Sequence, residues 1–123
     1  KKLKSRWSLK TPLHLEKTDR RYARHVKQLK TNGFSDAETW SLDSVICEFI
    51  LPRLQRFREV NNGFPYGFTE LSWNETLDKM IFAFQFHMKK YDWSPNKPGF
   101  DMEYARYEEG MNLFAKYFGD LWW

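Results

Sequence analysis

The chain has 123 residues, the size of one ordinary domain, and a net charge of +4 at pH 7. Its single cysteine, Cys47, cannot form a disulfide within the chain, which is typical of a reducing compartment. No apolar run is long enough to cross a membrane, and none follows the basic start as in a secretory signal. We therefore expect a cytoplasmic protein with no membrane partner.

Charge is distributed unevenly along the chain. Residues 1–30 hold eleven Lys and Arg against two acidic residues, a net charge of +9, and the remainder holds nine against fourteen, a net charge of −5. The basic segment either attracts phosphates or docks on an acidic surface of the same or another copy. Residues 1–15, which Pro12 interrupts, are predicted to be a basic N-terminal arm, and residues 16–123 a single helical domain.

The first predicted helix follows this arm. Thr18 is its expected N-cap, and the pair Asn32-Gly33 is expected to end it. One face of the helix is basic, and either contacts phosphates or nucleic acid or is simply solvated. The residues of this face are Arg20, Arg21, Arg24 and Lys27. No recognition-helix motif accompanies them, so sequence-specific reading of DNA is not expected.

A short helical turn and a long helix come next. The capping-box pattern Ser35-x-x-Glu38 predicts the turn, which carries Trp40. Apolar residues then recur at spacings of three and four over residues 42–60, which indicates an amphipathic helix. Pro52 lies inside this pattern and is expected to kink the helix, because proline removes one backbone hydrogen bond and clashes with the preceding turn.

Two further helices are predicted in the C-terminal half. The pattern Ser72-x-x-Glu75, with Thr69 as a competing cap, opens a helix whose wide apolar stripe predicts the most buried element of the fold. Asp101 is the expected cap of the last helix, whose apolar residues repeat like a short coiled-coil seam. The predicted fold is therefore all-α, a compact bundle of about four main helices with a proline-kinked second helix.

Neither a metal centre nor an enzyme active site is predicted. His14, His25 and His87 have no partner at metal-ligand spacing, and Cys47 lies beside an apolar stripe. Acidic pairs are interpreted as solvated helix faces, and no phosphate loop or nucleophile motif occurs. We therefore expect a binding protein with no cofactor and no metal rather than an enzyme.

Aromatic and arginine residues cluster around the expected kink and the loop that follows it. Aromatic rings stack on bases, and arginine side chains hold phosphates. The predicted ligand-binding residues are Trp40, Arg53, Arg56, Tyr66 and Trp73. The alternative is a rigid packed corner that binds no ligand.

Two adjacent tryptophans, Trp122 and Trp123, stand at the C-terminus. If they are exposed, they form a natural anchor for a partner protein or for a second copy of the chain. If they fold back, they close the bundle.

Several stretches are distinctive as strings: WSLDS at 40–44, FILPRL at 49–54, WNE at 73–75 with LDKMI at 77–81, and EGMNLFAKYF at 109–118 before Trp122-Trp123. Together they make residues 33–123 resemble a family of small uncharacterised tailed-bacteriophage proteins. Relatives carry a longer loop before the last helix, where this chain has only residues 92–100. The resemblance carries no activity or site residues and does not cover the basic first 30 residues. It implies an accessory protein that acts by stoichiometric binding in the cytoplasm of the infected bacterial host.

The leading hypothesis is a counter-defence protein that sequesters a nucleotide-like anionic ligand without catalysis and forms a homo-oligomer through its terminal aromatic segment. Three alternatives stay open: an inhibitor that binds a host protein, a non-specific nucleic-acid-binding protein that uses the basic N-terminal segment, and an enzyme that acts on a nucleotide.

Overall fold

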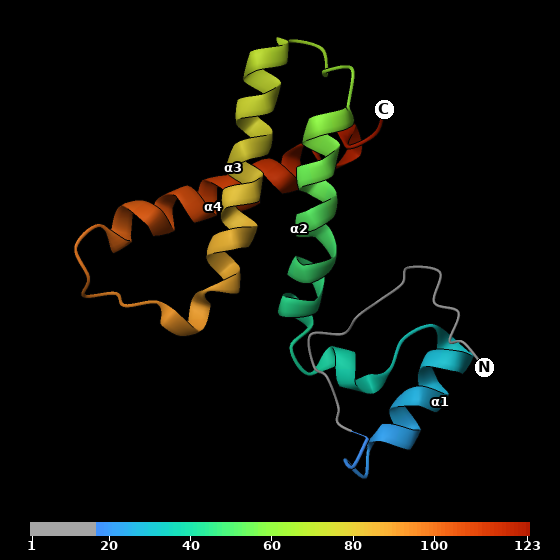
Figure 1. Cartoon of the computed structure of the whole chain (residues 1–123). Helices are drawn as coiled ribbons and strands as arrows, with labels where there is room; N and C mark the ends of the chain where they lie inside the picture. The colour runs from blue at the N-terminus through green and yellow to red at the C-terminus, as the bar shows by residue number, and fades with distance from the viewer. Residues whose placement is uncertain (1–16) are drawn as a thin grey trace. The chain divides into compact units, whose positions relative to one another are not determined.

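The computed structural model describes residues 17–123, and in this range every regular element is a helix (Figure 1). The four α-helices are α1 (Tyr22–Asn32), α2 (Leu42–Val60), α3 (Glu70–Met88) and α4 (Phe100–Lys116). Three short 3-10 helices accompany them: η1 (Asp36–Thr39), η2 (Lys90–Asp92) and η3 (Phe118–Asp120). The predicted all-α fold with four main helices is confirmed, and α2 continues as a helix through Pro52. The predicted arm, residues 1–15, lies outside the described residues.

The chain divides into two units, one ending at Phe49 and one comprising Ile50–Trp123, so that α2 begins in the first and ends in the second. We call them the N-terminal unit and the C-terminal unit and describe each by itself. The single domain expected over residues 16–123 stays a prediction.

Helix α1 of the N-terminal unit ends as predicted but begins later than predicted. Gly33 adopts a φ of 81°, and its N–H donates to the carbonyl of Leu29, which closes the helix. The expected Thr18 cap is wrong, because the side chain of Asp19 accepts the backbone N–H of Arg21 at 2.8 Å. This local Asp turn occupies the residues that a longer helix would need, so α1 begins at Tyr22.

The described N-terminal unit buries three polar or charged residues, His25, Ser35 and Glu38, as well as Ala37 and Cys47. The predicted capping box forms, with the N–H of Ser35 donating to Glu38 Oε2 at 2.7 Å. Ser35 Oγ and His25 Nδ1 share a hydrogen bond of 2.5 Å, and all three residues are buried. Because buried polar groups are costly unless they are paired, this network holds α1 in place against η1.

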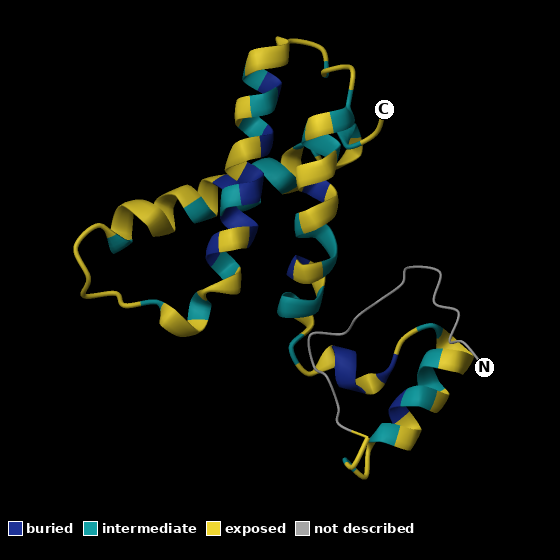
Figure 2. Ribbon diagram, viewed as in Figure 1, coloured by how far each residue is buried: buried dark blue, intermediate teal, exposed yellow. Residues whose placement is uncertain are grey.

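Helix α3 is the most buried element of the C-terminal unit, as predicted, and Figure 2 shows dark blue along its length. Its buried residues are Trp73, Leu77, Met80, Ile81, Ala83, Phe84 and Phe86. The competing cap prevails: Thr69 Oγ1 accepts the N–H of Ser72 at 3.1 Å, so the helix begins at Glu70.

Helix α4 crosses α3 at Gly110 (Figure 1). Gly110 is buried, and a Cβ atom there would lie 2.2 Å from the carbonyl oxygen of Lys79 and 2.6 Å from Cβ of Ala83. Beside the crossing, Lys79 pairs with Glu109 at 3.2 Å. The expected Asp101 cap is wrong, since Gly99, with a φ of 86°, precedes the first helical residue, Phe100.

Replacing Gly110 with alanine should therefore destabilise the C-terminal unit. The added methyl group meets backbone rather than a movable side chain, so we expect a loss of about 1–3 kcal/mol despite the better helix propensity of alanine. Urea unfolding of G110A and wild type measures the difference. The matched control is G119A, because nothing lies within 4 Å of a Cβ atom at Gly119. Equal stability of all three proteins would contradict the close crossing.

Candidate functional site

A pocket of about 230 Å³ lies in the C-terminal unit, where the loop between α2 and α3 faces the residues that follow α4. We call it the tryptophan pocket, and its aromatic and charged lining consists of Phe64, Trp73, Asp120, Trp122 and Trp123. Trp122 and Trp123 are 75% and 67% exposed, and Phe64 is 53% exposed. Of the two arrangements that the sequence leaves open for the terminal tryptophans, the structure therefore has the exposed one.

Trp73 forms the floor of this pocket and belongs to an aromatic cluster. The ring of Trp73 lies 5.1 Å from that of Phe68 and 6.0 Å from that of Tyr117, and Phe68 and Tyr117 lie 5.1 Å apart, all edge to face. The cluster joins the loop, α3 and the end of α4. Edge-to-face contacts of this kind add to the free energy gained by burying the rings. The floor is therefore a rigid support.

Two turns give the pocket its shape. In the loop, the N–H of Phe68 donates to the carbonyl of Pro65 at 3.0 Å, and Gly67 adopts a φ of 88°, a conformation that favours glycine. After α4, the helix η3 bends the chain, with the N–H of Leu121 donating to the carbonyl of Phe118 at 3.3 Å. This second turn brings Trp122 and Trp123 to the loop.

A polar extension adjoins the tryptophan pocket and shares four lining residues with it: Asn62, Gly63, Phe64 and Trp73. The charged residues of the extension are Arg58, Glu59 and Glu70. Arg58 donates to both carboxylate oxygens of Asp78, at 2.5 and 3.1 Å, and these hydrogen bonds raise the pKa of its guanidinium. Together with Asp120, the pocket and its extension hold three carboxylates against one guanidinium.

The five predicted ligand residues do not all fall in this pocket. Trp73 lines it, but only 2% of its surface is exposed, so its ring faces are not free to stack on a base. Tyr66 is fully exposed, and Arg56 pairs with Glu59 at 3.2 Å. Arg53 is exposed on α2, and Trp40 belongs to the N-terminal unit. That the five residues form one ligand site stays a prediction.

The N-terminal unit contains a second pocket, of about 220 Å³, which we call the basic pocket. Arg21, Arg24 and Trp40 line it. The guanidinium of Arg21 lies 4.5 Å from the centre of the Trp40 ring. Arg24 pairs with Asp36 at 3.0 Å. The structure thus joins one predicted ligand residue to two predicted phosphate contacts, whereas Arg20 and Lys27 are exposed and do not line this pocket.

Asp19 holds the Arg21 side chain. It accepts the guanidinium Nε at 3.0 Å and Nη2 at 2.8 Å. The hydrogen bonds from Arg21 hold the pKa of Asp19 far below its usual range, and Asp19 in turn raises the pKa of Arg21. Arg21 therefore stays charged and oriented toward Trp40.

Sequence reasoning assigned Trp73 and the terminal tryptophans to separate sites, and it did not single out Asp120. No spacing signal connects them, because they come from a loop, a helix and a turn that meet only in the folded chain.

Metal-binding and membrane-spanning features are absent from residues 17–123. No three His, Cys, Asp or Glu side chains in this range gather where they could hold a metal ion. None of the helices there is both long and apolar enough to cross a membrane.

The buried position of Trp73 leads to a prediction about its role. Replacing it with alanine removes the centre of the aromatic floor, so we expect W73A to destabilise the C-terminal unit by about 3–5 kcal/mol. Thermal or urea unfolding measures this loss. A fully stable W73A protein would contradict a structural role for this ring.

Comparison of the chain with models of protein families, with curated proteins and with solved structures finds no match. Its function therefore has to follow from its own residues.

Proposed function

We propose that this chain is a non-catalytic binding protein that holds a partner protein at the tryptophan pocket. The observation that carries the proposal is the exposure of Trp122 and Trp123 beside a pocket whose floor is the buried Trp73. Tryptophan is the residue type most enriched at the energetic centres of protein interfaces, because one side chain covers a large area with little loss of conformational freedom. Exposed aromatic surface next to a pocket is typical of an interaction site.

The rigidity of the pocket supports the same proposal. Phe68 and Tyr117 fix the floor, and the Gly67 turn fixes the loop that carries Phe64. A surface that is already ordered loses little entropy on binding, so more of the interaction energy becomes affinity. Binding by a preformed pocket requires no chemical step, which agrees with stoichiometric action.

The resemblance to tailed-bacteriophage proteins supplies the biological setting of the proposal. In that setting the chain is a phage accessory protein in the cytoplasm of the infected bacterial host, and its partner is a host protein that it blocks, such as a component of a defence system. A second copy of the chain is the alternative occupant, as in the expected homo-oligomer.

Single substitutions at the two tryptophans test this proposal. Truncation of an anchor residue at an interface costs about 2 kcal/mol or more, so W122A and W123A should each weaken partner binding by at least about tenfold. Quantitative capture of one identified partner from infected-host lysate, followed by calorimetry with the purified partner, measures the change. Both variants should unfold at the wild-type temperature, because these side chains are exposed.

The matched control is Y91A. Tyr91 is an 81% exposed aromatic residue beyond the other end of α3, and the part of α3 between Trp73 and Met88 is about 22 Å long at a rise of 1.5 Å per residue. Y91A should bind like the wild type. If W122A and W123A also bind like the wild type, the tryptophan pocket is not the interface. Sedimentation of the purified proteins shows whether the occupant is a second copy.

A second candidate function is the binding of a nucleotide-like anionic ligand at the basic pocket. Its support is the meeting of Trp40, which is 49% exposed, with the guanidinium groups of Arg21 and Arg24. An aromatic ring can stack on a base while arginine holds a phosphate. The same arginines would contact the phosphate backbone of a nucleic acid. Nucleic-acid binding by the basic N-terminal segment is one of the functions that the sequence leaves open.

Calorimetric titration with ADP, and separately with a short single-stranded DNA, tests this second candidate. Loss of one charge-assisted hydrogen bond costs about 1.5–3 kcal/mol, so R24A should weaken ADP binding by at least about tenfold, and W40A should weaken it as well. The matched control is K27A, which removes an exposed cation of the same helix outside the pocket. Equal losses in R24A and K27A, with a steep salt dependence, would indicate non-specific binding of polyanions instead.

A further inference from the structure

The charges around the tryptophan pocket indicate what kind of group enters it. Asp120 lines the pocket, and Glu59 and Glu70 line its polar extension. Arg58 is the basic residue that lines the polar extension. It donates to both carboxylate oxygens of Asp78, which lies outside the pocket, and this carboxylate largely neutralises its charge. Glu59 pairs with Arg56 at 3.2 Å, but both side chains are more than half exposed, so this pair is weak.

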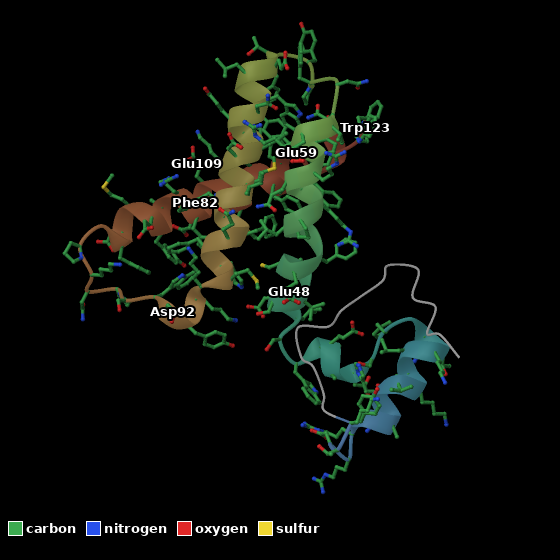
Figure 3. All side chains as sticks on the ribbon, in the orientation of Figure 1. Glu48, Glu59, Phe82, Asp92, Glu109 and Trp123 are labelled. Carbon is green, nitrogen blue, oxygen red and sulfur yellow. The ribbon has the colours of Figure 1, made fainter. Side chains whose placement is uncertain are left out.

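The two remaining carboxylates have no such partner within residues 17–123. Neither Asp120 nor Glu70 forms an ion pair with a described cation. Asp120 lies two residues before Trp122, and Glu70 lies in the first turn of the helix that carries Trp73. The aromatic walls are thus flanked by negative charge on the side of the terminal segment and on the side of α3. Figure 3 labels Glu59 and Trp123 at the end of α2 where the loop begins.

Aromatic rings and carboxylates select the same kind of ligand. The face of a tryptophan ring attracts a cation through its quadrupole, and a nearby carboxylate attracts it through its charge. The combination repels phosphate and carboxylate groups. A lysine or arginine side chain also has an apolar stem that can lie along the rings while its charged end reaches the carboxylates. A neutral apolar side chain would leave the carboxylates unused.

We propose that the tryptophan pocket takes a lysine or arginine side chain from a basic segment of the partner protein, so that Phe64, Trp122 and Trp123 contact the stem and Asp120 and Glu70 receive the charge. This inference rests on the proposed function and specifies its partner chemistry. It also assigns opposite preferences to the tryptophan pocket, which selects cations, and to the basic pocket, which favours anions.

Tryptophan indole N–H resonances test this inference directly. The chain has six tryptophans, and single substitutions assign the signals of Trp122 and Trp123. The probes are blocked peptides of glycine with one central arginine, lysine, leucine or glutamate. Arginine and lysine peptides should shift the Trp122 and Trp123 signals in a saturable way, with weaker effects of the leucine peptide and none of the glutamate peptide. The signal of Trp93, which packs against Phe86 and Tyr107 and does not line the tryptophan pocket, should not move.

Removal of the two carboxylates gives the second part of the test. In the double variant D120N/E70Q, loss of two partly exposed charge contacts should weaken arginine binding by about five- to thirtyfold while leucine binding is unchanged. The matched control is D101N/E108Q, which removes the same charge from exposed positions on α4 outside the pocket. The control should bind arginine like the wild type. Unchanged leucine binding in D120N/E70Q also establishes that the pocket is still folded.

Failure of this inference can be distinguished from failure of the proposed function. The cationic preference is wrong if D120N/E70Q binds the arginine peptide as well as the control variant does. It is also wrong if the leucine and glutamate peptides bind the wild type as well as the arginine peptide does. The proposed function would still stand provided that W122A loses partner binding. If W122A and W123A retain the partner, the function itself is wrong. If wild type is an oligomer that D120N/E70Q and high salt both dissociate, the cation comes from a second copy and the inferred foreign source is overturned.

Discussion

Helices α3 and α4 can pack as closely as they do only because Gly110 has no side chain where they cross. A Cβ atom there would lie 2.2 Å from the backbone oxygen of Lys79, a distance that no rotamer change can relieve. The close crossing covers the apolar stripe of α3 and determines where α4 ends. This placement brings the ring of Tyr117 into contact with that of Trp73, and the contact fixes the position of the chain at the start of η3. The tryptophan pocket forms because η3 then places Trp122 and Trp123 beside the α2–α3 loop.

Burial separates Trp73 from the two terminal tryptophans of the C-terminal unit. Trp73 is almost fully buried and supports the floor, whereas Trp122 and Trp123 keep most of their surface in water. Large exposed apolar side chains lower solubility and contribute little to folding, so a partner surface is the physical role that suits them. Charge adds a second criterion, because carboxylates beside rings select a cation.

The two units use polar residues in different ways. In the N-terminal unit, His25, Ser35 and Glu38 pair with one another in a buried network. Arg21 is held by Asp19, and Arg24 is held by Asp36. The basic pocket is therefore preorganised, but its cations already have partners, which an anionic ligand would have to displace. In the C-terminal unit, Asp120 lines the tryptophan pocket and Glu70 its polar extension, and neither has such a partner among residues 17–123. This difference favours the tryptophan pocket as the principal site.

Periodicity and capping chemistry are local properties, so the sequence by itself determined the four helices, the burial of α3, the glycine end of α1 and the turn at Ser35. Three helix starts were misplaced or ambiguous. Asp19 accepts the backbone N–H that a Thr18 cap would use, Thr69 rather than Ser72 caps α3, and Gly99 rather than Asp101 precedes α4. The exposure of the terminal tryptophans and their meeting with Trp73 at one pocket were decided only by the tertiary structure. The physical reason is that these contacts join residues about 50 positions apart, and no local pattern records a distance that depends on how α4 crosses α3 at Gly110.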